Sequence, residues 1–159
     1  GMSSGPVVVG NMGSADRMDY TMMGDVVNLA ARLEGVNKFY QTFTMISQST
    51  YELTKDDIDT RQLDVIRVVG KKEPISVYEV LERKNQTSSE KSGVVEKYLK
   101  ALKLYEERNF ADASKEFEKV LAIDPDDGPS KTYVKRCGVF LETPPEKDWD
   151  GVYTFTEKG

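Results

Sequence analysis

The stretch DYTMMGDVVNLAAR, residues 19–32, contains a turn, a helix start and two polar side chains at a fixed spacing. Apolar residues recur at helical intervals from about Gly24 to Lys38, which predicts an amphipathic helix. Asn28 and Arg32 are four positions apart, so they point the same way from that helix. An amide and a planar, permanently charged guanidinium both donate hydrogen bonds, which suits a phosphate or a reacting oxyanion. By themselves, the two residues also fit an ordinary solvated stripe beside an apolar face.

Short strands and a second helix are expected on either side of this helix. Residues 7–9 are three consecutive valines, which predict a buried strand that runs into a glycine-punctuated loop at 10–13 and then returns sharply. Downstream we expect a strand at 42–46, a short helix at 47–53, and a hairpin of strands 60–69 and 75–81 joined by a turn at 70–74. Residues 1–83 therefore read as an α+β layer of a sheet with helices packed on it.

The remainder of the chain has a different composition. Residues 84–93 are polar, which is typical of a linker, and from 94 to 142 the apolar residues recur only at helical spacing. We expect a small all-α domain there, a helical hairpin plus a capping helix, followed by an irregular tail at 143–159. The hairpin resembles a single tetratricopeptide repeat at Ala101, Tyr105, Phe110, Ala113, Phe117 and Pro125. One repeat cannot bury both faces, so we expect it to lean on residues 1–83 or on another copy of itself.

Composition excludes several classes of function. The 159 residues carry a net charge of −5, which argues against nucleic acid and against an anionic membrane surface as partners. There is no histidine, which removes imidazole metal ligands and Ser-His-Asp triads. The single cysteine, Cys137, fits a buried structural thiol better than a reactive one. No apolar run reaches the roughly 20 residues of a membrane span. We expect a cytoplasmic segment, with an upstream membrane anchor left open.

Two further strings extend the opening motif. They are GPVVVGNMGS at 5–14 and the continuation of the opening stretch to Glu34; Val68–Lys71 and Val77–Glu79 follow. Together these residues closely resemble the class III adenylate/guanylate cyclase catalytic domain, over roughly residues 3–82. The resemblance implies the C-terminal half of that domain, and the helical remainder resembles the repeat-containing tail found after some bacterial cyclase domains.

The resemblance assigns roles to four residues. Asn28 resembles the asparagine that orients the ribose and the reacting centre, and Arg32 resembles the arginine that stabilises charge on the attacked phosphate. Lys71 matches the lysine that holds the terminal phosphates, although beside Lys72 it would otherwise read as a charged turn. Thr21 stands where the family reads the purine edge, and a hydroxyl there favours ATP over GTP. It also fits a plain turn or strand hydroxyl.

The resemblance also implies a cofactor and a second protomer. Two Mg or Mn ions are held in the family by two aspartates from the first half of the domain, and we expect no metal ligands in this chain because residues 1–159 begin after that half. Asp16, Asp19 and Asp25 cluster in sequence but fit turn and helix-start positions. The family's site lies between two antiparallel-arranged protomers, so this chain would supply the asparagine, arginine and lysine side of a homodimer.

The expected function is therefore part of a bacterial-type adenylate cyclase that converts ATP to cyclic AMP and pyrophosphate in signal transduction. We expect the chain alone to be inactive, and to self-associate through an exposed edge or apolar face. The alternative is a non-catalytic dimerisation or nucleotide-sensing module whose helical repeat docks a protein partner. Aspartates at the metal-binding positions upstream of Gly1 would favour the enzyme.

Overall fold

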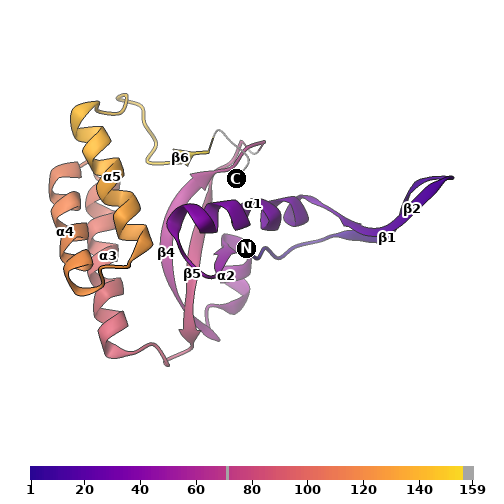
Figure 1. Cartoon of the computed structure of the whole chain (residues 1–159), viewed down its shortest axis with the longest axis horizontal. Helices are drawn as coiled ribbons and strands as arrows, with labels where there is room; N and C mark the ends of the chain where they lie inside the picture. Colours follow the sequence, from indigo (N-terminus) through magenta and orange to yellow (C-terminus); the bar gives the residue numbers. More distant parts are fainter. Residues whose placement is uncertain (71, 156–159) are drawn as a thin grey trace.

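The computed structural model describes residues 1–70 and 72–155. Figure 1 shows an extended hairpin at one end, a helical unit at the other, and a sheet with helices packed on it between them. The elements of the first 83 residues are β1 (Val8–Ser14), β2 (Arg17–Met23), α1 (Asp25–Tyr40), β3 (Met45–Ser47), α2 (Gln48–Thr54), β4 (Ile58–Arg67) and β5 (Ile75–Arg83).

Helix α1 follows the predicted amphipathic pattern and runs slightly further than expected. Its buried side chains repeat at helical spacing and form one stripe, Leu29, Leu33, Val36 and Tyr40. The helix ends where Gln41 adopts a left-handed conformation, with φ of 56°, and its N–H bonds to the carbonyls of Asn37 and Lys38. The predicted helix at 24–38 is thus confirmed, with one face packed and the neighbouring face left toward solvent.

The central sheet has the strand order β3-β5-β4-β6. The predicted hairpin is confirmed as the antiparallel β4–β5 ladder, and β3 pairs with the other edge of β5. Near the N-terminus, Met2 forms a parallel bridge with Ile46. Strand β6 (Tyr153–Thr154) pairs in parallel with Ile66 and Arg67. The tail predicted to be irregular at 143–159 therefore contains a short strand. The free edge of β4 offers backbone hydrogen bonds, and a strand of two residues can form them without a periodic sequence pattern.

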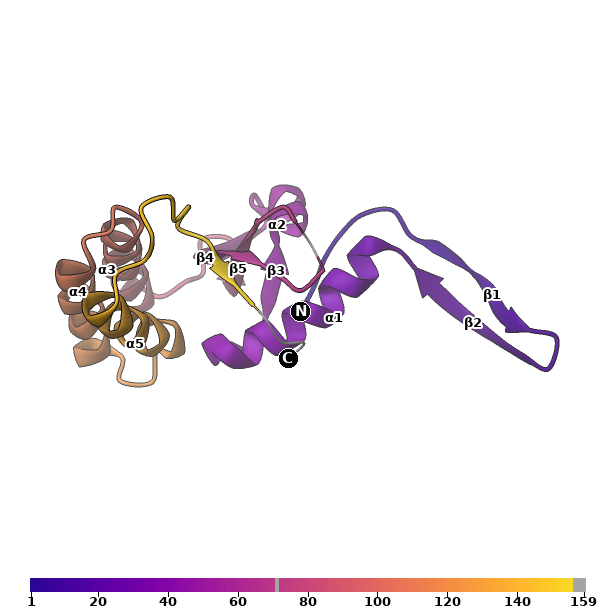
Figure 2. The same ribbon diagram turned by 90° about the horizontal axis from the view of Figure 1, so that it is seen from above.

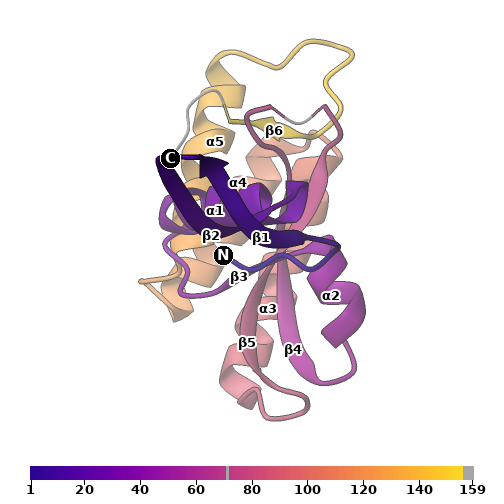
Figure 3. The ribbon, with the colours of Figure 1, turned by 90° about the vertical axis from the view of Figure 1, so that its right-hand side faces the viewer.

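Strands β1 and β2 form an antiparallel hairpin that projects away from the sheet (Figure 1), and in Figure 3 this hairpin faces the viewer in front of the other elements. Its register runs from Val8 opposite Met23 to Ser14 opposite Arg17. The predicted loop at 10–13 is wrong, because β1 continues through it and the chain turns only at residues 15–16. The predicted burial of the valine run is wrong too. Both strands are largely exposed, since the elements of the described chain that could cover them lie elsewhere.

The helical unit consists of α3 (Ser89–Glu106), α4 (Phe110–Ile123) and α5 (Gly128–Glu142). Helix α3 begins inside the predicted linker 84–93, because the Ser88 hydroxyl accepts a hydrogen bond from the Lys91 N–H and starts the helix among polar residues. Asp127 caps α5 in the same way. Within the described residues, no helix is long and apolar enough to cross a membrane.

One hydrophobic core runs through the sheet and the helical unit. It joins side chains of α1 and β4 to those of all three helices, including Leu33, Leu63, Tyr98, Phe117 and Tyr133. Figure 2 shows the C-terminal end of α1 and the sheet both beside the helical unit. The hydroxyls of Tyr98 and Tyr133 both donate to the carbonyl of Leu63, at 2.9 and 3.0 Å. The helical unit therefore packs against residues 1–83. This is one of the two arrangements expected from the sequence, the other being packing against a second copy of the unit.

Candidate functional site

The site is organised by the start of α1. Gly24 precedes the helix with φ of 156°, and a Cβ at this position would lie 3.2 Å from the carbonyl oxygen of Pro6. Glycine thus lets the chain pass from β2 into α1 close to the segment that leads into β1. Asn28 follows one turn into the helix and is exposed, and Arg32 follows one turn later and is half-buried. The helical spacing places the amide and the guanidinium on one side of α1, as predicted.

Arg32 lies against the turn that follows β4. A Cβ built on Gly70 would lie 3.3 Å from the Nη2 atom of Arg32, and Gly70 has φ of 78°, a conformation that favours glycine. In the described part of the chain, Arg32 has no carboxylate partner, and the Asn28 side chain has no hydrogen bond. The two donors are therefore available to an anion beside this turn.

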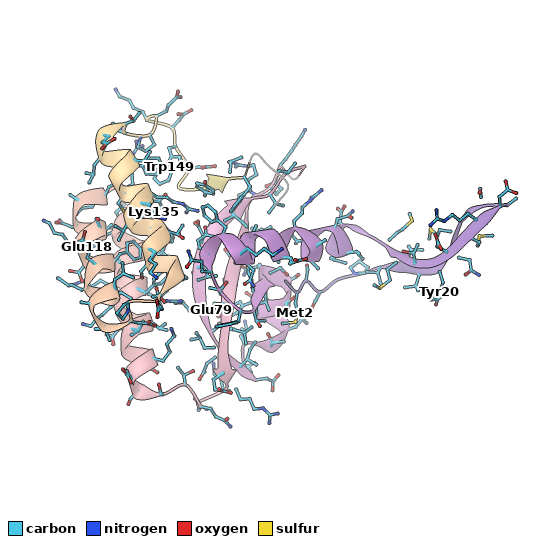
Figure 4. The ribbon with its side chains drawn as sticks, in the orientation of Figure 1. Met2, Tyr20, Glu79, Glu118, Lys135 and Trp149 are labelled. Atoms are coloured by element: carbon cyan, nitrogen blue, oxygen red, sulfur yellow. The ribbon has the colours of Figure 1, made fainter. Side chains whose placement is uncertain are left out.

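The structure does not bring Thr21, another predicted site residue, to this pair. Thr21 is an exposed residue of β2, paired with Gly10, and no hydrogen bond links it to α1 in the described chain. Its neighbour Tyr20 is labelled in Figure 4, on the projecting hairpin. Lys71 lies outside the described residues. The structure thus places Arg32 beside the Gly70 turn and leaves Thr21 on the hairpin.

The described acidic residues near α1 are not grouped as metal ligands. Within residues 1–70 and 72–155, no three cysteine, aspartate or glutamate side chains are grouped so that they could hold a metal ion. Asp19 instead faces Arg17, with 3.7 Å between Oδ2 and Nε, and both side chains are exposed. The described residues therefore do not fit the two ions that the family resemblance implies.

A buried polar cluster holds the other end of α1, and sequence reasoning missed it. Asp64 of β4 accepts hydrogen bonds from the Tyr40 hydroxyl and from Nη1 of Arg136, the latter at 2.5 Å. Nη2 of Arg136 donates to the Tyr40 oxygen at 2.7 Å. Burial raises the pKa of Tyr40, and the Asp64 carboxylate raises it further, so the phenol stays neutral. This cluster joins α1, β4 and α5.

A second buried ion pair fastens the sheet to the start of α5. Arg61 of β4 is 1% exposed by side chain and donates to Glu79 of β5, from Nη2 at 2.6 Å, and to Asp127, from Nη1 at 2.7 Å. Burial acts to lower the pKa of Arg61, but the two carboxylates outweigh it and raise the pKa. The guanidinium also lies over the ring of Tyr98, 4.5 Å from its centroid.

One feature of the sequence could have indicated these clusters. Arg61 and Asp64 are charged residues inside a strand that is otherwise rich in β-branched and apolar types. A register shift between Gln62 and Asp64 lets Leu63 and Asp64 both be buried, which strict alternation would not allow. Cys137 is buried, as predicted, and burial raises the pKa of its thiol to about 11.

Sequence comparison shows which known proteins the chain is similar to. Residues 1–82 match the family described as the adenylate and guanylate cyclase catalytic domain. The chain is 33% identical over 141 residues to the terminal-differentiation specific adenylate cyclase of Dictyostelium discoideum, covering 86% of this chain and 7% of that protein. It is 40% identical over 81 residues to adenylate cyclase 1 of Rhizobium meliloti, covering 51% of this chain and 12% of that protein. The chain thus spans only a small part of these relatives.

Solved structures of cyclases are also similar to part of the chain. The adenylyl cyclase CyaB from P. aeruginosa is 37% identical with a TM-score of 0.45, over 54% of this chain and 43% of that one. The guanylate cyclase domain of RhGC from Catenaria anguillulae, solved with GTP, is 34% identical with a TM-score of 0.41, over 52% of this chain and 43% of that one.

Proposed function

Because the chain belongs to the family of adenylate and guanylate cyclase catalytic domains, we propose that it supplies one side of a shared nucleotide cyclase site. The activity is conversion of ATP to cyclic AMP and pyrophosphate, in cytoplasmic signal transduction. A second copy of the domain completes the site. Asn28 and Arg32 are the proposed catalytic residues, and Thr21 and Lys71 the proposed substrate-binding residues.

The observation that carries this proposal is the position of Arg32. Its guanidinium lies beside Gly70, without a carboxylate partner in the described chain, and Asn28 lies one turn away on the same helix. The reaction joins the ribose 3′-oxygen to the α-phosphorus and breaks the bond to the leaving pyrophosphate. Catalysis then depends on positioning and on stabilising negative charge. Arg32 would donate to the attacked phosphate, while Asn28 would hold the ribose.

The metal ligands belong to the other side of the proposed site. The family's divalent ions stabilise charge on the phosphates when they are bound. The described residues do not fit such ions, so we propose that their carboxylates come from a segment outside residues 1–159. On this proposal, residues 1–159 alone do not make cyclic AMP.

Substrate choice and the helical unit complete the proposal. The uncharged hydroxyl of Thr21 would accept or donate a hydrogen bond at the purine edge, which favours ATP over GTP.

The alignment with the Dictyostelium adenylate cyclase covers 86% of the chain and so extends beyond residue 82 into the helical unit. We propose that this unit is a tetratricopeptide-like element and that its outward face docks a protein partner.

The decisive experiment measures cyclic nucleotide formation from ATP and from GTP with Mn²⁺. It compares residues 1–159 with a chain extended upstream to contain a whole catalytic domain. We expect activity only in the extended chain and a preference for ATP. Activity in residues 1–159 would contradict the proposed division of the site. A silent extended chain that still binds ATP and dimerises would instead support the non-catalytic module.

A further inference from the structure

A cavity lies at the other end of α1 from Asn28 and Arg32. It has a volume of about 450 Å³ and lies between the C-terminal end of α1, helix α5 and β6. Phe39 contributes from α1, Tyr153 from β6 and Val139 from α5. A cavity of this size suits a small organic molecule.

One side of the cavity is positively charged. Lys131, Lys135 and Arg136 of α5 all line it, and among the described lining residues none is acidic. Lys135, labelled in Figure 4, has no hydrogen bond or ion pair within residues 1–70 and 72–155. Lys131 has only the exposed Asp126, at 3.4 Å between Nζ and Oδ1. The chain as a whole carries a net charge of −5, so this concentration of positive charge is local.

The buried side chain of Arg136 distinguishes this cavity from a surface that merely carries two solvated lysines. Arg136 is 7% exposed, and its two terminal nitrogens donate hydrogen bonds to Asp64 and to the Tyr40 oxygen. Its Nε–H is buried and has no acceptor in the described chain. Buried donors are nearly always paired, and leaving one unpaired is unfavourable. Because this N–H has almost no accessible surface, Arg136 contributes its delocalised charge to the cavity rather than a hydrogen bond.

Another part of the cavity lining is apolar and aromatic. The rings of Phe39 and Tyr153 are stacked, with centroids 5.6 Å apart and an interplanar angle of 27°. The Arg136 guanidinium lies 3.6 Å from the Tyr153 ring centroid, so the charged and aromatic sides meet at this residue. This combination suits a molecule with an apolar or aromatic body and an anionic head.

We propose that this cavity binds a small organic anion. The head is a carboxylate or phosphate that pairs with Lys135 and Lys131 beside Arg136, and the body covers Phe39, Tyr153 and Val139. The site is separate from the proposed nucleotide cyclase site, and its occupation does not require that the chain catalyse anything.

The test is an NMR titration of residues 1–159 with valine methyl groups labelled. The probes are 2-naphthoate, 2-naphthyl phosphate and the neutral 2-naphthamide, which has nearly the same shape as the carboxylate. The Val139 methyls report on the cavity. The Val9 methyls, on the exposed β1–β2 hairpin, report on adhesion to apolar surface elsewhere.

The matched variants are Lys135→Gln and Lys97→Gln. Both lysines are exposed helical residues without a hydrogen bond or ion pair in the described chain, but only Lys135 lines the cavity. We expect at least one anion to shift Val139, naphthamide to bind far more weakly, and Lys135→Gln to weaken binding by about tenfold or more, as expected for a charge-assisted hydrogen bond. Lys97→Gln should bind as the parent does.

Three results would overturn the proposal. One is equal binding of the amide and the anions, which would make the cavity merely apolar. Another is equal affinity of the two lysine variants. The third is a shift at Val9 with none at Val139. The anion that binds more tightly shows whether the site prefers a carboxylate or a phosphate head group. Binding of either anion at Val139 supports the proposal.

Discussion

Arg32 is the residue on which the proposed activity depends most. In the extended chain, Arg32→Ala should lower the rate of cyclic AMP formation by about 100- to 1000-fold, as found when one donor to a transition-state oxyanion is removed. The physical reason is that the guanidinium beside Gly70 has no carboxylate partner in the described chain and is free to stabilise phosphate charge.

The matched control for this change is Lys38→Ala on the same helix. Lys38 is exposed and pairs with Glu34 at 2.8 Å, on the surface of α1. Initial rates of the two variants, measured at saturating ATP with Mn²⁺, separate a catalytic role from a general effect on the helix. Equal rates in the two variants would remove Arg32 from the proposed machinery.

At the scale of elements, Asp64 decides how α1, β4 and α5 are held together. Asp64→Asn keeps the shape of the side chain but removes the charge that faces Arg136. We expect the free energy of unfolding to fall by about 3 kcal/mol, because a buried cation loses its counter-charge. Urea unfolding followed by circular dichroism measures this change. Asp112→Asn, which breaks an exposed pair with Lys115 on α4, is the control and should leave the midpoint nearly unchanged.

The β1–β2 hairpin is the element that most favours self-association. Met18, Tyr20 and Met22 alternate along β2 and are 61%, 76% and 58% exposed. Two strands alone are marginally stable in water, and exposed apolar strands pair with other chains. We expect the sedimentation-average mass to rise with concentration, and the double change Met18→Lys with Met22→Lys to suppress that rise. A constant monomer mass in the parent chain would contradict this expectation.

For the whole molecule, the continuous core predicts one cooperative unfolding transition. The single tryptophan, Trp149, packs on Tyr105 and Phe140 and so reports on the helical unit, with ring centroids at 5.5 and 5.2 Å. Far-UV circular dichroism reports on the whole chain. Both signals should change at the same temperature, because the core and two buried ion pairs cross from β4 to α5. Two separated transitions would show that residues 1–83 and the helical unit unfold independently.

Local features explain what the sequence predicted well. The apolar repeat in α1, the β4–β5 hairpin and the three C-terminal helices all depend on residues that are close together in the sequence. Segment ends were less predictable. The start of α3 depends on one capping serine, Ser88, within a polar stretch, and the two-residue strand β6 depends on the free edge of β4. Neither leaves a periodic pattern in the sequence.

The sequence by itself determined the family, the helix that carries Asn28 and Arg32, and the succession of a mixed unit and a helical one. These follow from motifs and from periodic burial, which are properties of neighbouring residues. Only the tertiary structure decided that Arg32 meets Gly70, that Asp64 pairs with Arg136 across 72 positions, and that Lys135 and Tyr153 line one cavity. The physical reason is that ion pairs and cavities depend on distances in space, and packing brings together side chains whose separation along the chain carries no signal of their contact.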